Sequence, residues 1–139
     1  MKLVLIGVIV CVSMLNAVDY KEVDKRQEQM AIEVCSKIKR ECLVVYSAYP
    51  YNTQELPVNN LNKIALKGKV IVIQKHDKFW GKGKNYKSKI YQNPTWLDLS
   101  ILANEMIRVT GDKHHVYLED FEIIKNKKGI QYIELQMGS

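Results

Sequence analysis

The first 17 residues constrain this chain more than any other feature of its sequence. Met1 and Lys2 form a short positive start, and residues 3–15 follow without a charged side chain. The run closes on a small residue, Ala17, and charged residues begin directly after it. A positive start, a short apolar run and a small-residue stop predict a cleavable secretory signal peptide over residues 1–17. We therefore expect an exported protein, periplasmic or secreted, whose working part is residues 18–139.

Two other interpretations of this segment stay open. A retained membrane anchor needs about 20 apolar residues, and the run over residues 3–15 is shorter than that. A lipoprotein needs a small residue just before the modified cysteine, whereas Val10 precedes Cys11. Residues 18–139 have the length of a single domain, which we expect to be α+β. Because the sequence has no second long apolar run, we expect this part to be soluble or at most peripheral.

Removal of the signal would leave two cysteines, Cys35 and Cys42. An even number of cysteines in an oxidising compartment favours a disulfide. Seven residues of unbroken helix cover about 10.5 Å, which exceeds the roughly 7 Å between Cα atoms that a disulfide tolerates. A bond therefore requires the helix to end between the two cysteines. The alternative is a pair of buried thiols on one helix face.

Hydrophobic periodicity predicts one helix followed by several strands. Apolar residues recur every three or four positions over residues 19–40, which indicates an amphipathic helix. Residues 69–74 form a continuous β-branched run typical of a central strand, and residues 96–101 alternate as a half-buried strand does. The best hairpin signal is over residues 121–135, where Asn-Lys-Lys-Gly at 126–129 separates two β-type runs. We predict an α+β fold, with an N-terminal amphipathic helix followed by an antiparallel sheet.

Three stretches resemble parts of small OB-type barrels. Residues 66–72, Leu-Lys-Gly-Lys-Val-Ile-Val, resemble the opening strand of such barrels. Residues 107–111, Ile-Arg-Val-Thr-Gly, followed by Tyr-Leu-Glu-Asp at 117–120, resemble the closing strand pair. The resemblance covers residues 64–125 and implies a small OB-like barrel behind an N-terminal helix, as in small exported OB-fold-like domains. A cystatin-like or NTF2-like helix on a curved sheet is the alternative, which the C-terminal hairpin suits.

The most distinctive part of the chain is residues 75–91, called here the basic-aromatic segment. It holds six lysines and one acidic residue, with four aromatic rings between the lysines. Positive charge interleaved with stacking rings is what binds single-stranded nucleic acid or sugars. The alternative is a solvated basic loop whose Trp80 packs back into the core. The predicted binding residues are Lys75, Lys78, Phe79, Trp80, Lys82, Lys84, Tyr86, Lys87, Lys89 and Tyr91.

The charge of the chain indicates the chemistry of a partner. Its formal net charge is +6, and only Arg26, Arg40 and Arg108 of its basic residues are arginines. Lysine supplies a point charge without the fork of a guanidinium, so a lysine-rich surface attracts polyanions generally. We expect an anionic polymer, an anionic membrane surface or an envelope protein as partner, and no cytosolic partner.

The sequence contains no motif for catalysis or for metal binding. His114 and His115 would point to opposite faces of a strand, and no Cys-x-x-Cys or His-x-x-x-His spacing occurs. A hydrolase would have to use Arg108 with Asp112 and Glu119, which match no known motif. We therefore predict no catalytic residues, no metal ligands and no cofactor.

These observations favour an exported, non-catalytic binding protein that contacts an anionic partner through the basic-aromatic segment. An inhibitor or modulator of a cell-envelope enzyme, acting through loops such as residues 46–57, is the first alternative. A secreted hydrolase is the second.

Overall fold

Two helices and six strands make up the described part of the chain. The structure is a computed structural model, and it describes residues 20–47 and 60–139. The predicted signal peptide and nearly all of the predicted inhibitor loop, residues 46–57, lie outside the described residues. The elements in chain order are α1 (Tyr20–Lys37), β1 (Val45–Tyr46), β2 (Lys69–Gln74), β3 (Tyr86–Lys87), β4 (Tyr91–Gln92), α2 (Trp96–Thr110), β5 (Tyr117–Lys127) and β6 (Ile130–Gly138).

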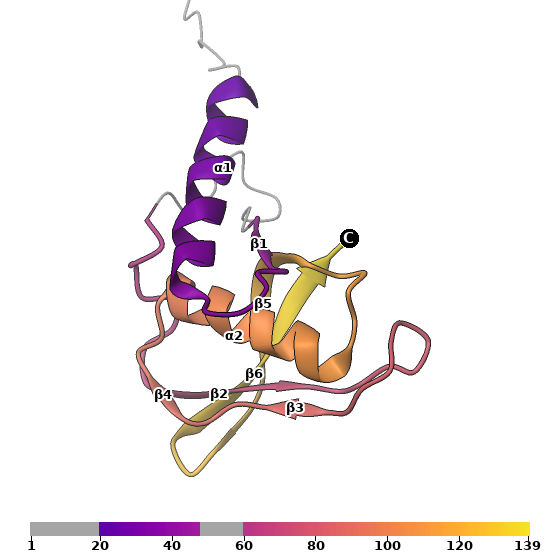
Figure 1. Cartoon of the computed structure of the whole chain (residues 1–139). Coiled ribbons are helices and arrows are strands. Elements are labelled where there is room, and N and C mark those ends of the chain that lie inside the picture. The colour runs from indigo at the N-terminus through magenta and orange to yellow at the C-terminus, as the bar shows by residue number, and fades with distance from the viewer. Residues whose placement is uncertain (1–19, 48–59) are drawn as a thin grey trace, which may run out of the picture.

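The six strands form one open, mixed sheet (Figure 1). Its order is β1-β5-β6-β2-β3, and β4 also pairs with β2. The β5–β6 pair is antiparallel, whereas β1 runs parallel to β5 and β2 runs parallel to β6. The α+β class is therefore confirmed, and the expectation of a purely antiparallel sheet is wrong for these two pairings. Within the described residues the sheet does not close into a barrel.

Helix α2 replaces two predicted strands. The alternation over residues 96–101 is real but short, and over the whole of Trp96–Thr110 the buried positions follow a helical period. Thr95 and Asp98 form a capping box, in which the Thr95 hydroxyl accepts from Asp98 N at 3.1 Å and the Asp98 carboxylate accepts from Thr95 N at 2.8 Å. Gly111 ends the helix in the left-handed conformation, with φ of 74°. Residues 107–111, expected as a barrel strand, are the last turn of this helix and its cap.

The predicted C-terminal hairpin is confirmed and is longer than expected. Strands β5 and β6 pair from Tyr117 with Gly138 to Lys127 with Ile130. The two residues between them, Lys128 and Gly129, both have positive φ, as a two-residue hairpin turn requires. Leu118, Ile133 and Leu135 are buried and place one face of the hairpin on the core.

Strands β3 and β4 are two parts of one edge strand with a bulge between them. Along β2, Ile73 pairs with Lys87 and Val70 pairs with Tyr91, so three residues of the edge strand oppose two of β2. Ser88 sits in this bulge. Its hydroxyl accepts from Val72 N at 2.9 Å, and its own N–H donates to Val72 O at 2.9 Å. The ladder therefore continues through the bulge, and the second half of the basic-aromatic segment is held to the sheet.

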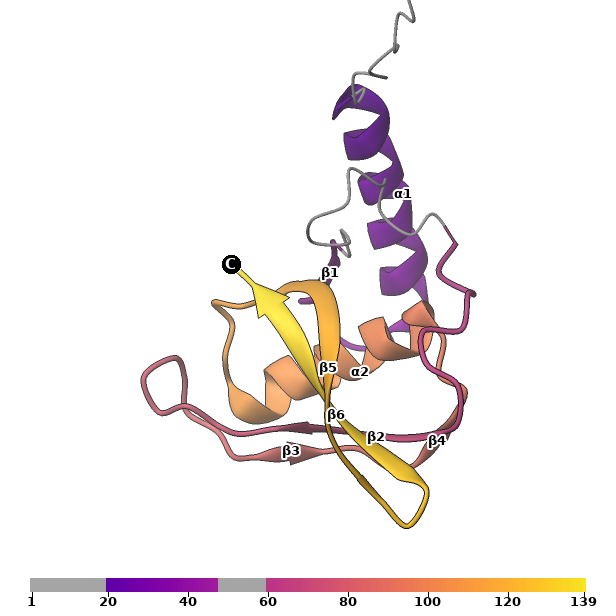
Figure 2. The ribbon, with the colours of Figure 1, turned by 180° about the vertical axis from the view of Figure 1, so that it is seen from behind.

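Helix α1 contacts α2 and β1 and extends away from the sheet at its N-terminal end (Figures 1 and 2). Met30 and Val34 are buried against the core, whereas Lys21, Glu22 and Asp24 near the helix start are exposed. α2 contacts β2 and β3 of the sheet, whereas α1 contacts its edge strand β1. None of the helices in the described residues is long and apolar enough to cross a bilayer.

The predicted disulfide is present. Helix α1 ends at Lys37, between Cys35 and Cys42, which brings their Cα atoms to 5.4 Å. The chain after the helix is then fixed to α2 by Asn104, which is 2% exposed. The Asn104 side chain accepts from Leu43 N at 2.6 Å and donates to Glu41 O at 3.2 Å. The short connection after α1 is therefore held to α1 by the disulfide and to α2 by the buried Asn104 amide.

Replacing both cysteines by serine should lower the stability of the protein. The bridge closes a loop with a sequence separation of seven residues. Removing a disulfide that closes a loop of this size lowers the free energy of unfolding by about 2–3 kcal/mol, because the unfolded chain gains entropy. Urea unfolding of the double variant and of the reduced wild type should give the same lower midpoint. An unchanged midpoint in both would contradict the disulfide.

Candidate functional site: a basic-aromatic surface

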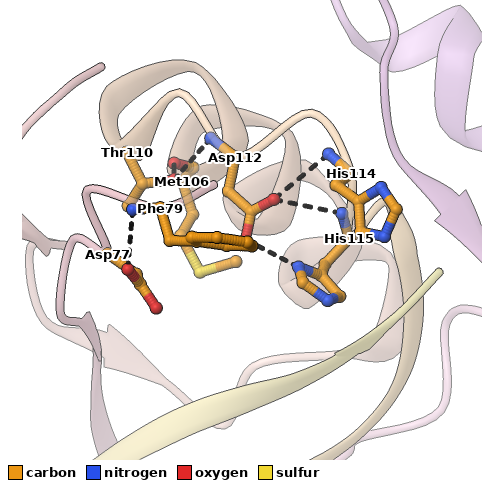
Figure 3. Close-up of polar contacts among 7 residues, drawn as sticks. All are labelled: Asp77, Phe79, Met106, Thr110, Asp112, His114 and His115. Atoms are coloured by element: carbon orange, nitrogen blue, oxygen red, sulfur yellow. Dashed lines mark hydrogen bonds and ion pairs between the residues drawn. The ribbon is translucent and has the colours of Figure 1, made fainter. Parts of the chain in front are cut away.

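The six lysines of the basic-aromatic segment all lie on the surface. Each is exposed, and none forms an ion pair with another described residue. The one carboxylate of the segment, Asp77, accepts from Phe79 N at 2.8 Å and so stabilises the local turn (Figure 3). Within residues 20–47 and 60–139, therefore, no carboxylate pairs with the positive charges of the segment. The lysines are Lys75, Lys78, Lys82, Lys84, Lys87 and Lys89.

Two of the four predicted rings are accessible at the tip of the β2–β3 connection. Phe79 is 79% exposed and Trp80 is 39% exposed. The Phe79 ring lies edge-on to Trp80, with 4.7 Å between centroids. One face of Trp80 stacks on His114 at 4.5 Å and 8°. Trp80 thus packs back onto the molecule, but against a histidine and not in the core, and Phe79 is the ring most open to a partner.

The histidines are positioned by the turn after α2 (Figure 3). One oxygen of Asp112 accepts from the backbone N–H groups of His114 and His115, at 3.1 and 3.2 Å. The other oxygen lies 2.8 Å from His115 Nδ1. His115 in turn lies edge-on to Trp80, with 4.9 Å between ring centroids. The turn therefore presents a prepared stacking surface to Trp80, which no local sequence pattern predicts.

Glycines dock the segment on the last turn of α2. A Cβ atom at Gly81 would overlap the carbonyl oxygen of Gly111, and one at Gly83 would overlap the carbonyl oxygens of Val109 and Thr110. Lys84 N donates to Val109 O at 3.0 Å just beyond this contact. The two glycines are there because the two backbones touch, and not because the connection has to be flexible.

Tyr86 and Tyr91 support the segment more than they offer rings to a partner. Tyr86 is 7% exposed and belongs to the core, where its hydroxyl donates to Glu105 Oε2 at 3.0 Å. Burial first, and then the nearby Glu105 carboxylate, raise the pKa of the Tyr86 phenol above its ordinary value. Tyr91 is half-buried, and the Lys89 ammonium lies 5.5 Å from its ring centroid.

The basic surface continues onto the C-terminal hairpin, which sequence reasoning missed. The ring of Tyr132 on β6 lies between two ammonium groups, Lys87 Nζ at 5.8 Å and Lys125 Nζ at 4.7 Å from its centroid. These three residues come from strands β3, β5 and β6. Their proximity depends on the parallel pairing of β2 with β6, which joins strands far apart in the sequence. It cannot be seen in the sequence alone.

A cavity of about 290 Å³ lies behind Trp80. Met106, Met137 and Leu135 provide its apolar lining, and Gln74 and His115 provide polar groups. The buried Gln74 Oε1 has no hydrogen-bond partner among the described residues. Lys75 and Trp80 of the basic-aromatic segment therefore border a partly polar hollow.

The residues considered for hydrolysis do not assemble. Arg108 lies in a different cavity from Asp112, and Glu119 lies against Gly138 at the end of β6. In the described ranges, no group of three or more His, Cys, Asp or Glu side chains is arranged to hold a metal ion.

Comparison of the chain with known protein families, with curated proteins and with solved structures finds no match. The site is therefore interpreted from its own geometry.

Gly83→Ala should destabilise the docking of the segment. The added methyl group has to displace backbone carbonyls of α2, and such overpacking costs about 1–3 kcal/mol. Urea unfolding followed by circular dichroism measures the loss. Lys82→Ala, at an exposed neighbouring position, is the matched control and should change stability by less than about 0.5 kcal/mol. Equal stability of the two variants would mean that the backbones do not touch.

Tyr86→Phe should make stability less sensitive to alkaline pH. A phenol whose pKa is raised by folding stabilises the protein fully below the unfolded pKa of about 10, and this stabilisation is lost as the pH rises above it. Wild type should lose about 1 kcal/mol more than the variant between about pH 7 and pH 10.5. Parallel alkaline losses in urea unfolding would contradict the burial of this hydroxyl.

Proposed function

We propose that this protein is an exported, non-catalytic binding protein that contacts an anionic polymer through the basic-aromatic segment. The observation that carries the proposal is the exposure of all six lysines without an ion pair to another described residue. Exposed cations along an extended stretch attract a chain of negative charges because each contact releases a counterion.

The rings give the surface a second mode of contact. Phe79 is exposed beside Lys78, and stacking of a base or sugar on such a ring tolerates many sequences. Lys87, Lys125 and Tyr132 extend the same chemistry onto the sheet. Lysine lacks the planar fork that selects one phosphate geometry. We therefore propose binding that is general for polyanions and not specific for one sequence.

Two further observations support the export part of the proposal. The Cys35–Cys42 disulfide is the kind of bond that persists in an oxidising compartment. The sequence of residues 1–17 has the organisation of a signal peptide. An envelope or extracellular polymer is then a more suitable partner than the genome. A membrane surface and an acidic envelope protein are the competing partners for the same lysines.

Charge reversal of four lysines should abolish polyanion binding. The variant is Lys78→Glu, Lys82→Glu, Lys84→Glu and Lys87→Glu, and the probe is fluorescein-labelled oligothymidylate followed by anisotropy. Wild type should bind with a slope of about −3 to −4 in log affinity against log salt between about 50 and 200 mM. The variant should bind at least about 100-fold more weakly at the lower salt.

The matched control reverses four other exposed lysines and so changes the net charge equally. It carries Lys63→Glu, Lys67→Glu, Lys127→Glu and Lys128→Glu, which lie outside the basic-aromatic segment. Four such changes lower the formal net charge from +6 to −2 in both variants, so the control should bind more weakly than wild type but at least about tenfold more tightly than the segment variant. Equal losses in both variants, or no binding by wild type at low salt, would overturn the proposal.

A further inference from the structure

A second basic site lies beside α2, and the buried Tyr86 of the basic-aromatic segment is one of its lining residues. A cavity of about 430 Å³ opens between α2 and the connection that follows α1. Four cations and a single carboxylate, Glu105, line it. Its volume is within the range of small-molecule sites, which run from about 300 to 1,000 Å³. The cations are Lys37, Lys39, Arg40 and Arg108.

Three of the four cations belong to one short, fixed stretch. Lys37, Lys39 and Arg40 lie between the two cysteines of the disulfide. The Asn104 amide and the Arg108 guanidinium both donate to the carbonyl oxygen of Glu41, which ends this stretch. The backbone of this side of the cavity is therefore preorganised, and less conformational entropy is lost when a ligand binds.

The fourth cation, Arg108, has a buried N–H group without a hydrogen-bond acceptor among the described residues. Arg108 Nη2 donates to Glu41 O, but the buried Nε–H has no acceptor among the described residues. Burial of an unpaired donor is costly, and buried polar groups nearly always find a partner. An anion near this guanidinium would offset that cost by Coulomb attraction.

The rest of the lining indicates what the anion is attached to. Ile38, Ile101 and Val109 give the cavity apolar surface, which suits an organic group. Several full positive charges in one cavity favour a doubly charged group over a singly charged one, because each adds its own Coulomb attraction. Arginine adds the fork that fits phosphate oxygens.

We infer that this cavity is a binding site for a small organic phosphate, with Arg108, Arg40 and Lys39 on the phosphate and the isoleucines on its organic part. The inference does not depend on the lysines of the basic-aromatic segment, because none of the six lines this cavity, to which the segment contributes the buried Tyr86. It assigns a ligand class to a region that neither the polyanion surface nor the disulfide explains.

The test is isothermal titration of the purified, oxidised protein at constant ionic strength. The probes are phenyl phosphate, inorganic phosphate, benzoate and benzyl alcohol. Phenyl phosphate should bind in a saturable way and most tightly, inorganic phosphate more weakly, and benzoate more weakly still. Absence of saturable binding by phenyl phosphate, or benzoate binding as tightly, would overturn the inference.

Two variants and one mapping experiment locate the binding. Lys39→Glu with Arg40→Glu changes exposed side chains and should weaken phenyl phosphate at least about tenfold, the loss expected when a charge-assisted hydrogen bond is removed. Lys63→Glu with Lys67→Glu is the control of equal charge and should stay near wild type. In amide chemical-shift mapping, the Ile38 and Asn104 resonances should move. Equal weakening in both variants, or shifts elsewhere, would contradict the site.

Discussion

The contact between the backbone of the basic-aromatic segment and the last turn of α2 is the constraint on which the candidate surface depends. The backbone at Gly81 and Gly83 lies against the backbone of residues 109–111. The two segments are so close that no side chain fits between them. This contact fixes the position of the lysine-rich connection on α2. Trp80 then reaches the histidines after α2 and stacks on His114. The lysines are exposed because the backbone, and not their side chains, makes the packing contacts.

Helix α2 organises both basic sites. Its C-terminal turn holds the basic-aromatic segment, and its middle holds the connection after α1 through Asn104, which is 2% exposed. The chain therefore uses one buried helix to position two exposed, positively charged regions. The proposed ligands differ accordingly, with long anions for the exposed surface and small ones for the cavity beside Arg108.

Sequence patterns predicted those features that depend on near neighbours. The hairpin followed from the turn at residues 126–129, the strand over 69–74 from its β-branched run, and the disulfide from an even pair of cysteines. Helix α2 was missed because six alternating residues outweighed the capping signal of Thr95 and Asp98. That box, together with Gly111, was the available evidence for a helix.

Features that depend on distant residues were out of reach. The parallel pairing of β2 with β6 joins residues about 60 positions apart in the chain, and with it the ring of Tyr132 comes to lie between Lys87 and Lys125. The stacking of Trp80 on His114 and the burial of Tyr86 depend on how the segment docks on α2. Composition identified the basic-aromatic segment correctly as unusual, but only the fold separates its exposed cations from its supporting rings.

The most direct test of the central claim is amide chemical-shift mapping of the protein with oligothymidylate at low salt. We expect the largest shifts in residues 75–89, with further shifts at Lys125 and Tyr132 on the neighbouring strands. Shifts centred on Lys37, Lys39 and Arg40, or spread evenly over the exposed lysines without a cluster, would show that the basic-aromatic segment is not the binding surface.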